Sequence, residues 1–245
     1  MIAIAIVSAM REEMRALLPL LQDARIERRA GREFHLGRLD GHEAVLVLSG
    51  IGKVAAATTA SMLIDRFEVR ALLLTGVAGG LGDGVKVGDV VIARTLLQHD
   101  MDASPIFPRF EVPLTGRSHF PADAGLCAAL ASATRSVLSA PHAALARFGI
   151  EGPRLHEGLV VSGDRFVSSA RESAVLRAAL PDALAVEMEG AAVAQVCADL
   201  CCPFAVLRTI SDRADDAAHL DFTRFIAEIA AEFSRDIVRA TLHQL

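Results

Sequence analysis

The sequence predicts an α/β sandwich, in which helices cover a central sheet of buried strands. Short β-type runs alternate with helical stretches along most of the chain. The runs are continuously apolar rather than alternating, as "IAIAIV" (2–7) and "RALLLTGV" (70–77) show, and this favours strands buried on both faces. No repeat, low-complexity tract or linker-like charge block interrupts the pattern, so a single domain over residues 1–245 is the simplest interpretation.

Each element is placed by the same contrast between apolar runs and helical stretches. Seven strands are expected, over residues 2–7, 44–48, 70–77, 88–97, 158–163, 183–188 and 204–211. Helices are expected near 10–22, from the start of "GKVAAATTASMLIDRF" after the second strand, and near 221–243 at the end of the chain. A glycine-rich loop, "AGGLGDG", follows the third strand.

Residues 98–122 form the least regular part of the sequence. Four prolines there exclude a long helix or a central strand. The segment also carries three of the eleven phenylalanines, with Ile106 close by. Two interpretations stay open: a stiff loop that forms a pocket wall or a subunit contact, and a loop that packs back on its own core.

The composition limits the class of protein. Hydrophobic residues make up 52% of the 245 residues, and the mean hydropathy is +0.39. A net charge of −5 argues against a general nucleic-acid binder. No apolar run approaches the roughly 18–20 residues that span a membrane, and "MIAIAIVSAM" lacks the basic leader of a signal peptide, so we expect a cytoplasmic protein. The four cysteines lack the spacing of a zinc site and are expected to be small buried hydrophobic residues.

Polar residues at the strand ends point to the chemistry. In open α/β sheets, ligands bind where the carboxyl ends of the strands meet the loops. Those ends carry several carboxylates together with an arginine, a serine and an aromatic residue: Glu12, Glu13, Asp164, Phe166, Glu187, Glu189, Arg208, Ser211, Asp212 and Asp215. The glycine-rich segments match neither a Walker loop nor the G-x-G-x-x-G fingerprint, so a nucleotide-phosphate site has little support.

The segment "LAVEMEGAAVAQVC" (184–197) places two glutamates in an otherwise apolar run. An ionised carboxylate in such a setting is costly unless charge-assisted hydrogen bonds compensate it. The alternative is a helix start that faces solvent, where glutamate suits the helix dipole. This window alone leaves both interpretations open for Glu187 and Glu189.

Six segments in register resemble one family. They are "AMREEM", "SGIGKVAAA", "TGVAGGL", "VSGDRFV", "AVEMEGAAVAQVC" and "RTISDRAD". In this order they are similar to the 5′-methylthioadenosine/S-adenosylhomocysteine nucleosidases of the nucleoside phosphorylase/hydrolase superfamily, over nearly the whole chain. The resemblance implies a nucleoside phosphorylase-like fold, a three-layer α/β/α sandwich with a central mixed β-sheet. It also implies hydrolysis of the N-ribosyl bond of 5′-thio-substituted adenosines to release adenine, and no metal or organic cofactor is expected.

The resemblance assigns catalytic roles to three residues. Asp212 matches the acid that protonates adenine N7, and for this task its pKa must lie well above the free value of about 3.9. Glu13 matches the base that activates a water on the far face of the ribose. Arg208 is expected to orient the same water.

Other positions match the substrate-binding residues of the family. Glu189 would accept hydrogen bonds from the ribose 2′- and 3′-hydroxyls, with Met188 against the sugar, and an acceptor-only group suits this task. Glu187 matches no such role and is expected to be structural. Adenine would stack on Phe166, with backbone groups of Val167 reading its edge. The other residues expected at the site are Met10, Ile51, Ala78, Gly79 and Ser211.

The resemblance also implies a homodimer. In the family a loop of the partner subunit closes the 5′-thio pocket, and here that loop would be residues 98–116. Ile106 and Pro108 stand where relatives carry aromatic residues, and Val77 replaces a serine that many relatives have near the catalytic aspartate. These departures leave the preferred 5′ substituent open.

Three other functions remain as alternatives. A nucleoside phosphorylase would gather arginines and a serine around phosphate, whereas Glu13 would repel that anion. A nucleosidase for another 5′-modified adenosine, of the futalosine type, is compatible with Val77 and with the altered loop. A non-catalytic nucleoside-binding module is the alternative from a different class, and the catalytic carboxylates together with Arg208 argue against it.

Overall fold

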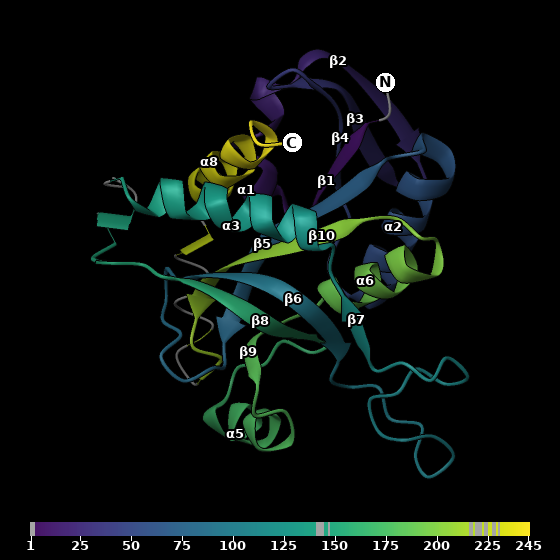
Figure 1. Cartoon of the computed structure of the whole chain (residues 1–245), viewed down its shortest axis with the longest axis vertical. Helices are drawn as coiled ribbons and strands as arrows, with labels where there is room; N and C mark the ends of the chain where they lie inside the picture. The colour runs from purple at the N-terminus through teal and green to yellow at the C-terminus, as the bar shows by residue number, and fades with distance from the viewer. Residues whose placement is uncertain are drawn as a thin grey trace.

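The computed structural model describes residues 3–140, 145–146, 148–215, 218, 222, 225–226, 229 and 231–245. Within this part of the chain ten strands form one mixed sheet (Figure 1). The strands are β1 (Ile4–Ser8), β2 (Gln22–Arg29), β3 (Arg32–Leu39), β4 (His42–Leu48), β5 (Ala71–Gly80), β6 (Val90–Gln98), β7 (His119–Pro121), β8 (Leu155–Ser162), β9 (Ala183–Glu187) and β10 (Phe204–Asp212). The predicted α/β class and the mixed central sheet are confirmed.

The order of the strands brings distant parts of the chain to one edge of the sheet. Neighbouring strands follow the order β10-β6-β8-β9-β5-β1-β4-β3-β2, and β10 also pairs with β5. Strands β5, β10, β6, β8 and β9 therefore close into a ring, from which β1, β4, β3 and β2 extend as an open sheet. Because β4, β1, β5 and β10 are parallel neighbours, their carboxyl ends lie at the same edge, where such folds bind ligands.

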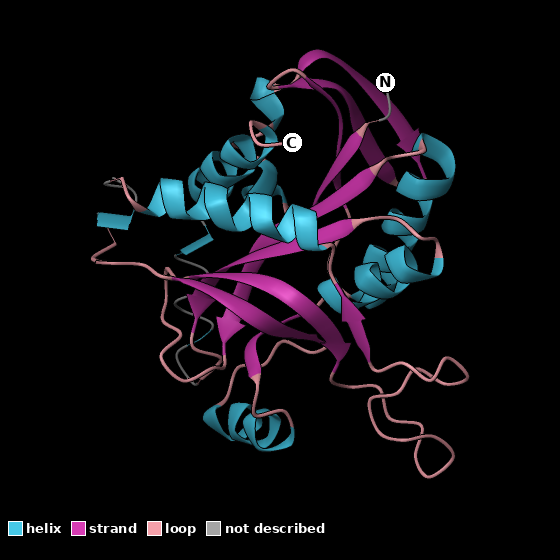
Figure 2. Ribbon diagram, viewed as in Figure 1, coloured by secondary structure: helices cyan, strands magenta, loops and turns pink. Residues whose placement is uncertain are grey.

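Helices cover the two faces of the sheet, as Figures 1 and 2 show. The helices are α1 (Arg11–Met14), α2 (Lys53–Phe67), α3 (Ala124–Leu138), α5 (Ala170–Ala179), α6 (Gly190–Asp199) and α8 (Ala231–Leu242). Helices α2 and α6 pack together over one face, and α3 and α8 pack together over the other. In β1, Ile4 and Ile6 contribute to the core under α3 and α8, whereas Ala5 and Val7 contribute to the core under α2 and α6. Burial on both faces explains the continuous apolar run.

The helix predicted near 10–22 is wrong in length. Helix α1 covers only Arg11–Met14, and a 3-10 turn over Leu18–Leu20 follows it. Pro19 has no N–H to donate and its ring opposes an α-helix at this point. The chain then enters the β2–β3 hairpin, which the sequence did not predict because β2 is exposed along nearly its whole length and shows no apolar face.

Smaller differences concern the ends of elements. Strand β5 continues to Gly80, so the first part of the expected glycine-rich loop is strand. Residues 99–118 are irregular, as the prolines predict, whereas the short strand β7 lies within the segment expected to be irregular and pairs with β6. Helices α3, α5 and α6 lie in stretches for which no bounds were predicted. The closing helix is confirmed as α8, and most of the predicted segment from 221 to 230 lies outside the described residues.

The cysteines are not all buried. Cys127, Cys197 and Cys202 are buried as expected, but Cys201 is exposed, which corrects the prediction for that residue. It follows α6 in a turn, where its φ is 54°. No helix within the described ranges is long and apolar enough to cross a membrane.

Candidate active site

A cavity of about 430 Å³ opens at the carboxyl ends of the parallel strands. The predicted site residues that line it are Met10, Glu13, Ile51, Ala78, Gly79, Phe166, Val167, Met188, Glu189, Ser211 and Asp212. They come from α1, from the loops after β1, β4, β8 and β9, and from the ends of β5 and β10. Strand order thus gathers residues that are far apart in the sequence into one site.

Glu13 is a buried carboxylate held by the backbone. The N–H groups of Ala9 and Met10 donate to its Oε2 at 2.9 and 3.0 Å, and the N–H of Val77 donates to Oε1 at 3.1 Å. Burial raises the pKa of Glu13, and the positive charge of Arg208 and the three backbone donors oppose that rise. A fixed carboxylate whose pKa is raised is suited to accept a proton near neutral pH.

Arg208 lies behind the cavity wall and is only 1% exposed. Its guanidinium donates to Glu187 and lies 3.5 Å from Oε2 of Glu189. A Cβ on Gly76 would come within 2.7 Å of Oε1 of Glu13 and still closer to Nη1 of Arg208. The absence of a side chain at Gly76 therefore lets the arginine and Glu13 approach strand β5.

Glu187 is occupied entirely by contacts with the protein. Its carboxylate accepts from the N–H of Gly190 at 2.8 Å and of Glu189 at 3.1 Å, and from Ser162 Oγ and Arg208. It thereby caps the start of α6, where the helix dipole favours a negative charge. These contacts support the structural role expected for Glu187.

Glu189 faces the cavity with part of its hydrogen-bonding capacity free. The N–H of Gly52 donates to its Oε1 at 2.9 Å. Burial first, and then the negative charge of Glu187, raises the pKa of Glu189 to about 7. Because the N–H of Gly52 and the guanidinium of Arg208 are its described hydrogen-bond donors, the carboxylate has lone pairs left for two hydroxyl donors from a ligand. The interpretation of this residue as a solvent-facing helix start is wrong, because it is 5% exposed.

Both carboxylate oxygens of Asp212 are held in place at the end of β10. Ser211 Oγ donates to Oδ2 and the N–H of Ala214 donates to Oδ1, each at 2.8 Å. A Cβ on Gly79 would lie 2.9 Å from Oδ1, so this glycine lets the carboxylate reach the cavity wall. The raised pKa expected for Asp212 stays a prediction.

Two aromatic rings form one wall of the cavity. Phe166 is 39% exposed and contacts Phe222 edge to face, with ring centroids 5.5 Å apart at an interplanar angle of 68°. Phe222 was not predicted, because it lies outside the six motif segments. Such a wall offers a stacking surface for a planar base.

A network of charged groups joins the loops around the site. Asp164 accepts from the N–H of Lys53 at 2.7 Å, and Asp100 accepts from the N–H of Asp164 at 2.9 Å. Lys53 Nζ donates to Asp100 at 2.6 Å and to Gln98 at 3.1 Å. The N–H of Gly52, the residue before Lys53, donates to the carboxylate of Glu189. The network therefore links the loop that carries Phe166 to Glu189.

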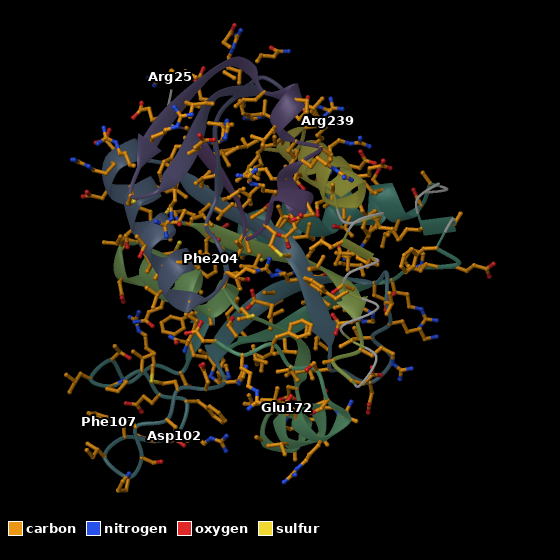
Figure 3. All side chains as sticks on the ribbon, turned by 180° about the vertical axis from the view of Figure 1, so that it is seen from behind. Arg25, Asp102, Phe107, Glu172, Phe204 and Arg239 are labelled. Atoms are coloured by element: carbon orange, nitrogen blue, oxygen red, sulfur yellow. The ribbon has the colours of Figure 1, made fainter. Side chains whose placement is uncertain are left out.

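Ile106 and Pro108 do not line the cavity of their own chain. Ile106 is 81% exposed, and Leu114 in the same loop is 90% exposed. Figure 3 shows Asp102 and Phe107 projecting away from the body of the molecule. The interpretation that this loop packs back on its own core is wrong for its tip, and its contact with a second subunit stays a prediction.

The cavity also has residues that the sequence did not single out, namely Ala9, Arg165 and Val186. They adjoin predicted residues in the chain, but their own side chains carry no motif signal. Val77, predicted to lie near the sugar, does line the cavity. Among the described residues, no group of three or more His, Cys, Asp or Glu side chains could hold a metal ion.

Comparison with known proteins shows the family of this chain. A family model described as the Phosphorylase superfamily matches residues 3–243. The 5′-methylthioadenosine/S-adenosylhomocysteine nucleosidase of Colwellia psychrerythraea is 37% identical over 241 residues, which cover 98% of this chain and 95% of that protein.

Solved structures give the same result. The nucleosidase of Neisseria meningitidis in complex with methylthio-immucillin-A is 36% identical, with a TM-score of 0.90 and full coverage of both chains. A futalosine hydrolase mutant of Helicobacter pylori is 32% identical, with a TM-score of 0.86 and full coverage of both chains. The chain therefore belongs to the phosphorylase superfamily and, within it, to the 5′-methylthioadenosine/S-adenosylhomocysteine nucleosidases.

Proposed function

We propose that this protein hydrolyses the N-ribosyl bond of S-adenosylhomocysteine and 5′-methylthioadenosine and releases adenine. The observation that carries the proposal is the placement of Glu13, a buried carboxylate that faces the cavity and is fixed by three backbone donors. Asp212 and Glu189 line the same cavity. An acid, a base and a hydroxyl acceptor are the groups that hydrolysis of a nucleoside requires.

Asp212 is the proposed acid. Adenine is a poor leaving group until a proton reaches N7, and the stacking wall of Phe166 and Phe222 would hold the base beside the Asp212 carboxyl. The hydrogen bonds from Ser211 and Ala214 fix the direction of that carboxyl. Val167 would read the edge of adenine with its backbone groups, as Gly79 and Ala78 close the opposite side.

Glu13 is the proposed base and Glu189 the proposed ribose acceptor. Glu13 would take a proton from the attacking water, and Glu189 would accept the 2′- and 3′-hydroxyls while its charge stabilises the cationic sugar of the transition state. Arg208 acts mainly through these carboxylates, because its guanidinium is already bound to Glu187 and lies beside Glu189. We propose that Arg208 orients the water next to Glu13 indirectly, through its charge on Glu13 and its contact with Glu189.

The charge of the site favours water over phosphate as the nucleophile. The guanidinium of Arg208 already forms a salt bridge with Glu187. The negative charge of Glu13, which lines the cavity, would repel a phosphate ion bound there. Val77 offers no hydroxyl to an anion. A phosphorylase reaction is therefore disfavoured by the same residues that suit hydrolysis.

Two further parts of the proposal concern assembly and location. We propose a homodimer in which residues 98–116 close the 5′ pocket of the partner, supported by the exposure of Ile106 and Leu114. The composition favours the cytoplasm. A nucleosidase for futalosine-type substrates is the second candidate, supported by Val77 and by the likeness to the Helicobacter pylori futalosine hydrolase.

The test is adenine release by the purified protein in phosphate-free buffer, followed by chromatography with either nucleoside. Release without phosphate supports a hydrolase, and we expect Glu13→Gln to bind nucleoside but lose turnover. Release only after phosphate is added would refute hydrolysis. Release of the free base, adenine or hypoxanthine, only from futalosine-type nucleosides would favour the second candidate.

A further inference from the structure

A second cavity of about 640 Å³ adjoins the nucleoside cavity. The two cavities share Ala9, Met10 and Ile51 as a common wall. The second one extends from this wall toward the start of α1 and the β2–β3 turn, where Arg11 and Arg32 lie. Apart from the shared wall, the residues of this cavity take no part in the proposed hydrolysis.

Three charged side chains line the second cavity: Arg11, Glu12 and Arg32. Arg11 and Glu12 are exposed, and within the described part of the chain neither forms an ion pair. Arg32 is held by the protein, since its Nε, Nη1 and Nη2 donate to Thr59 Oγ1, Ala30 O and Ala55 O at 2.7, 2.9 and 3.2 Å.

The charge of Arg32 is fixed in place but not neutralised. Its described partners are neutral oxygens, and two of its five N–H donors remain for a ligand. Two cations and one carboxylate therefore line a space whose remaining walls are largely apolar. A ligand that matches them carries a carboxylate and an ammonium group, as an α-amino acid does.

In the proposed function, adenine lies beside Asp212 and the ribose hydroxyls bind Glu189. Of the remaining cavity wall, Met10 and Ile51 are then left to face the 5′ carbon, and these two residues also line the second cavity. A methylthio group would end at that wall. The longer tail of S-adenosylhomocysteine continues past the sulfur and ends in an amino-acid group.

We propose that the second cavity binds the amino-acid tail of S-adenosylhomocysteine, with Arg32 and Arg11 donating to its carboxylate and Glu12 accepting from its ammonium group. The proposal rests on the proposed function and names the part of the site that distinguishes the two substrates. The fixed guanidinium of Arg32 is preorganised, so little conformational entropy is lost on binding. 5′-Methylthioadenosine makes no contact with these charges.

The experiment compares kcat/KM for the two nucleosides in the native protein, Arg11→Gln, Arg32→Gln and Glu12→Gln. We expect each arginine variant to lower the ratio of S-adenosylhomocysteine to 5′-methylthioadenosine by about tenfold, the effect of one lost charged hydrogen bond, chiefly through KM. Arg28→Gln is the matched control, because Arg28 lies on the same hairpin, is paired with Glu33 and does not line the cavity. Added salt should raise KM for S-adenosylhomocysteine alone.

The outcomes separate the subsite from the proposed function. A ratio within twofold of native in both arginine variants would overturn the subsite. If Arg32→Gln fails to fold, Arg11→Gln decides, since Arg11 makes no described side-chain contact that folding needs. If the native protein releases adenine from neither nucleoside, the proposed function fails, and calorimetric Kd values for both nucleosides in native and Arg11→Gln protein then test the subsite alone.

Discussion

Gly76→Ala tests whether the catalytic geometry depends on close approach to strand β5. A Cβ at this position would lie 2.7 Å from Oε1 of Glu13, whereas ordinary van der Waals contact begins at 3.4 Å, so the carboxylate must move by about 0.7 Å. Arg208 Nη1 would be nearer still and must move as well. Both groups are buried, and Glu13 is tied to three N–H donors, so the movement breaks hydrogen bonds rather than only displacing solvent.

The magnitude follows from that displacement. A misplacement of about 1 Å in a catalytic group costs on the order of 10²-fold in rate, and we expect kcat for adenine release to fall by about this factor. Overpacking of a buried site costs roughly 1–3 kcal/mol of unfolding free energy, which a large domain survives. Thermal unfolding therefore reports a folded protein with a Tm lowered by several degrees.

The assay is steady-state adenine release with 5′-methylthioadenosine, measured beside a matched glycine variant. Gly125→Ala serves as the control, because Gly125 lies in the first turn of α3 and a Cβ there meets only Asp123 Oδ1 at 3.3 Å. A folded Gly76→Ala protein with kcat within threefold of native would refute the reasoning, since Glu13 and Arg208 would then tolerate displacement.

Three further predictions concern the carboxylates. Asp212→Asn should abolish turnover while the protein still binds adenine, because the amide has the shape of the carboxyl group but cannot protonate N7. Native-like rates in this variant would exclude the acid role of Asp212. Glu187→Ala should lower the unfolding free energy, measured by chemical denaturation, by about 3–5 kcal/mol, because it leaves Arg208 without its closest partner and α6 without its cap. The control variant Glu33→Ala, on the surface, should change the unfolding free energy by less than about 0.5 kcal/mol. The pKa of Glu189 is about 7 in the folded protein against an ordinary value of 4.5. Between these two pH values the folded protein therefore holds a proton that the unfolded chain has lost. The stability of the ligand-free protein should accordingly fall as pH rises from 4.5 to 7. The same titration should give kcat/KM an ascending limb near pH 7, because the ionised carboxylate accepts the ribose hydroxyls; flat stability and a flat profile over this range would contradict the assignment.

The sequence was sufficient for the parts of the fold that local patterns encode. Strands β1, β5 and β10 are buried on both faces, and such strands appear as continuous apolar runs. The β2–β3 hairpin escaped prediction because β2 is exposed and its residues show no apolar period. Pro19 was the available signal against a long first helix, and it marks where α1 gives way to the 3-10 turn.

The candidate site divides in the same way. By itself the sequence determined which residues stand at strand ends, and six ordered motifs were enough to identify the family and to propose Glu13, Glu189 and Asp212 as functional. The resemblance had separated Glu187 from Glu189, but only the tertiary structure gave the physical reason, because Arg208, Ser162 and the start of α6 all engage the carboxylate of Glu187. Only the tertiary structure placed Phe222 on the cavity wall and Arg32 in the second cavity that adjoins it. Residues far apart in the chain meet through strand order and packing, and no local pattern records that proximity.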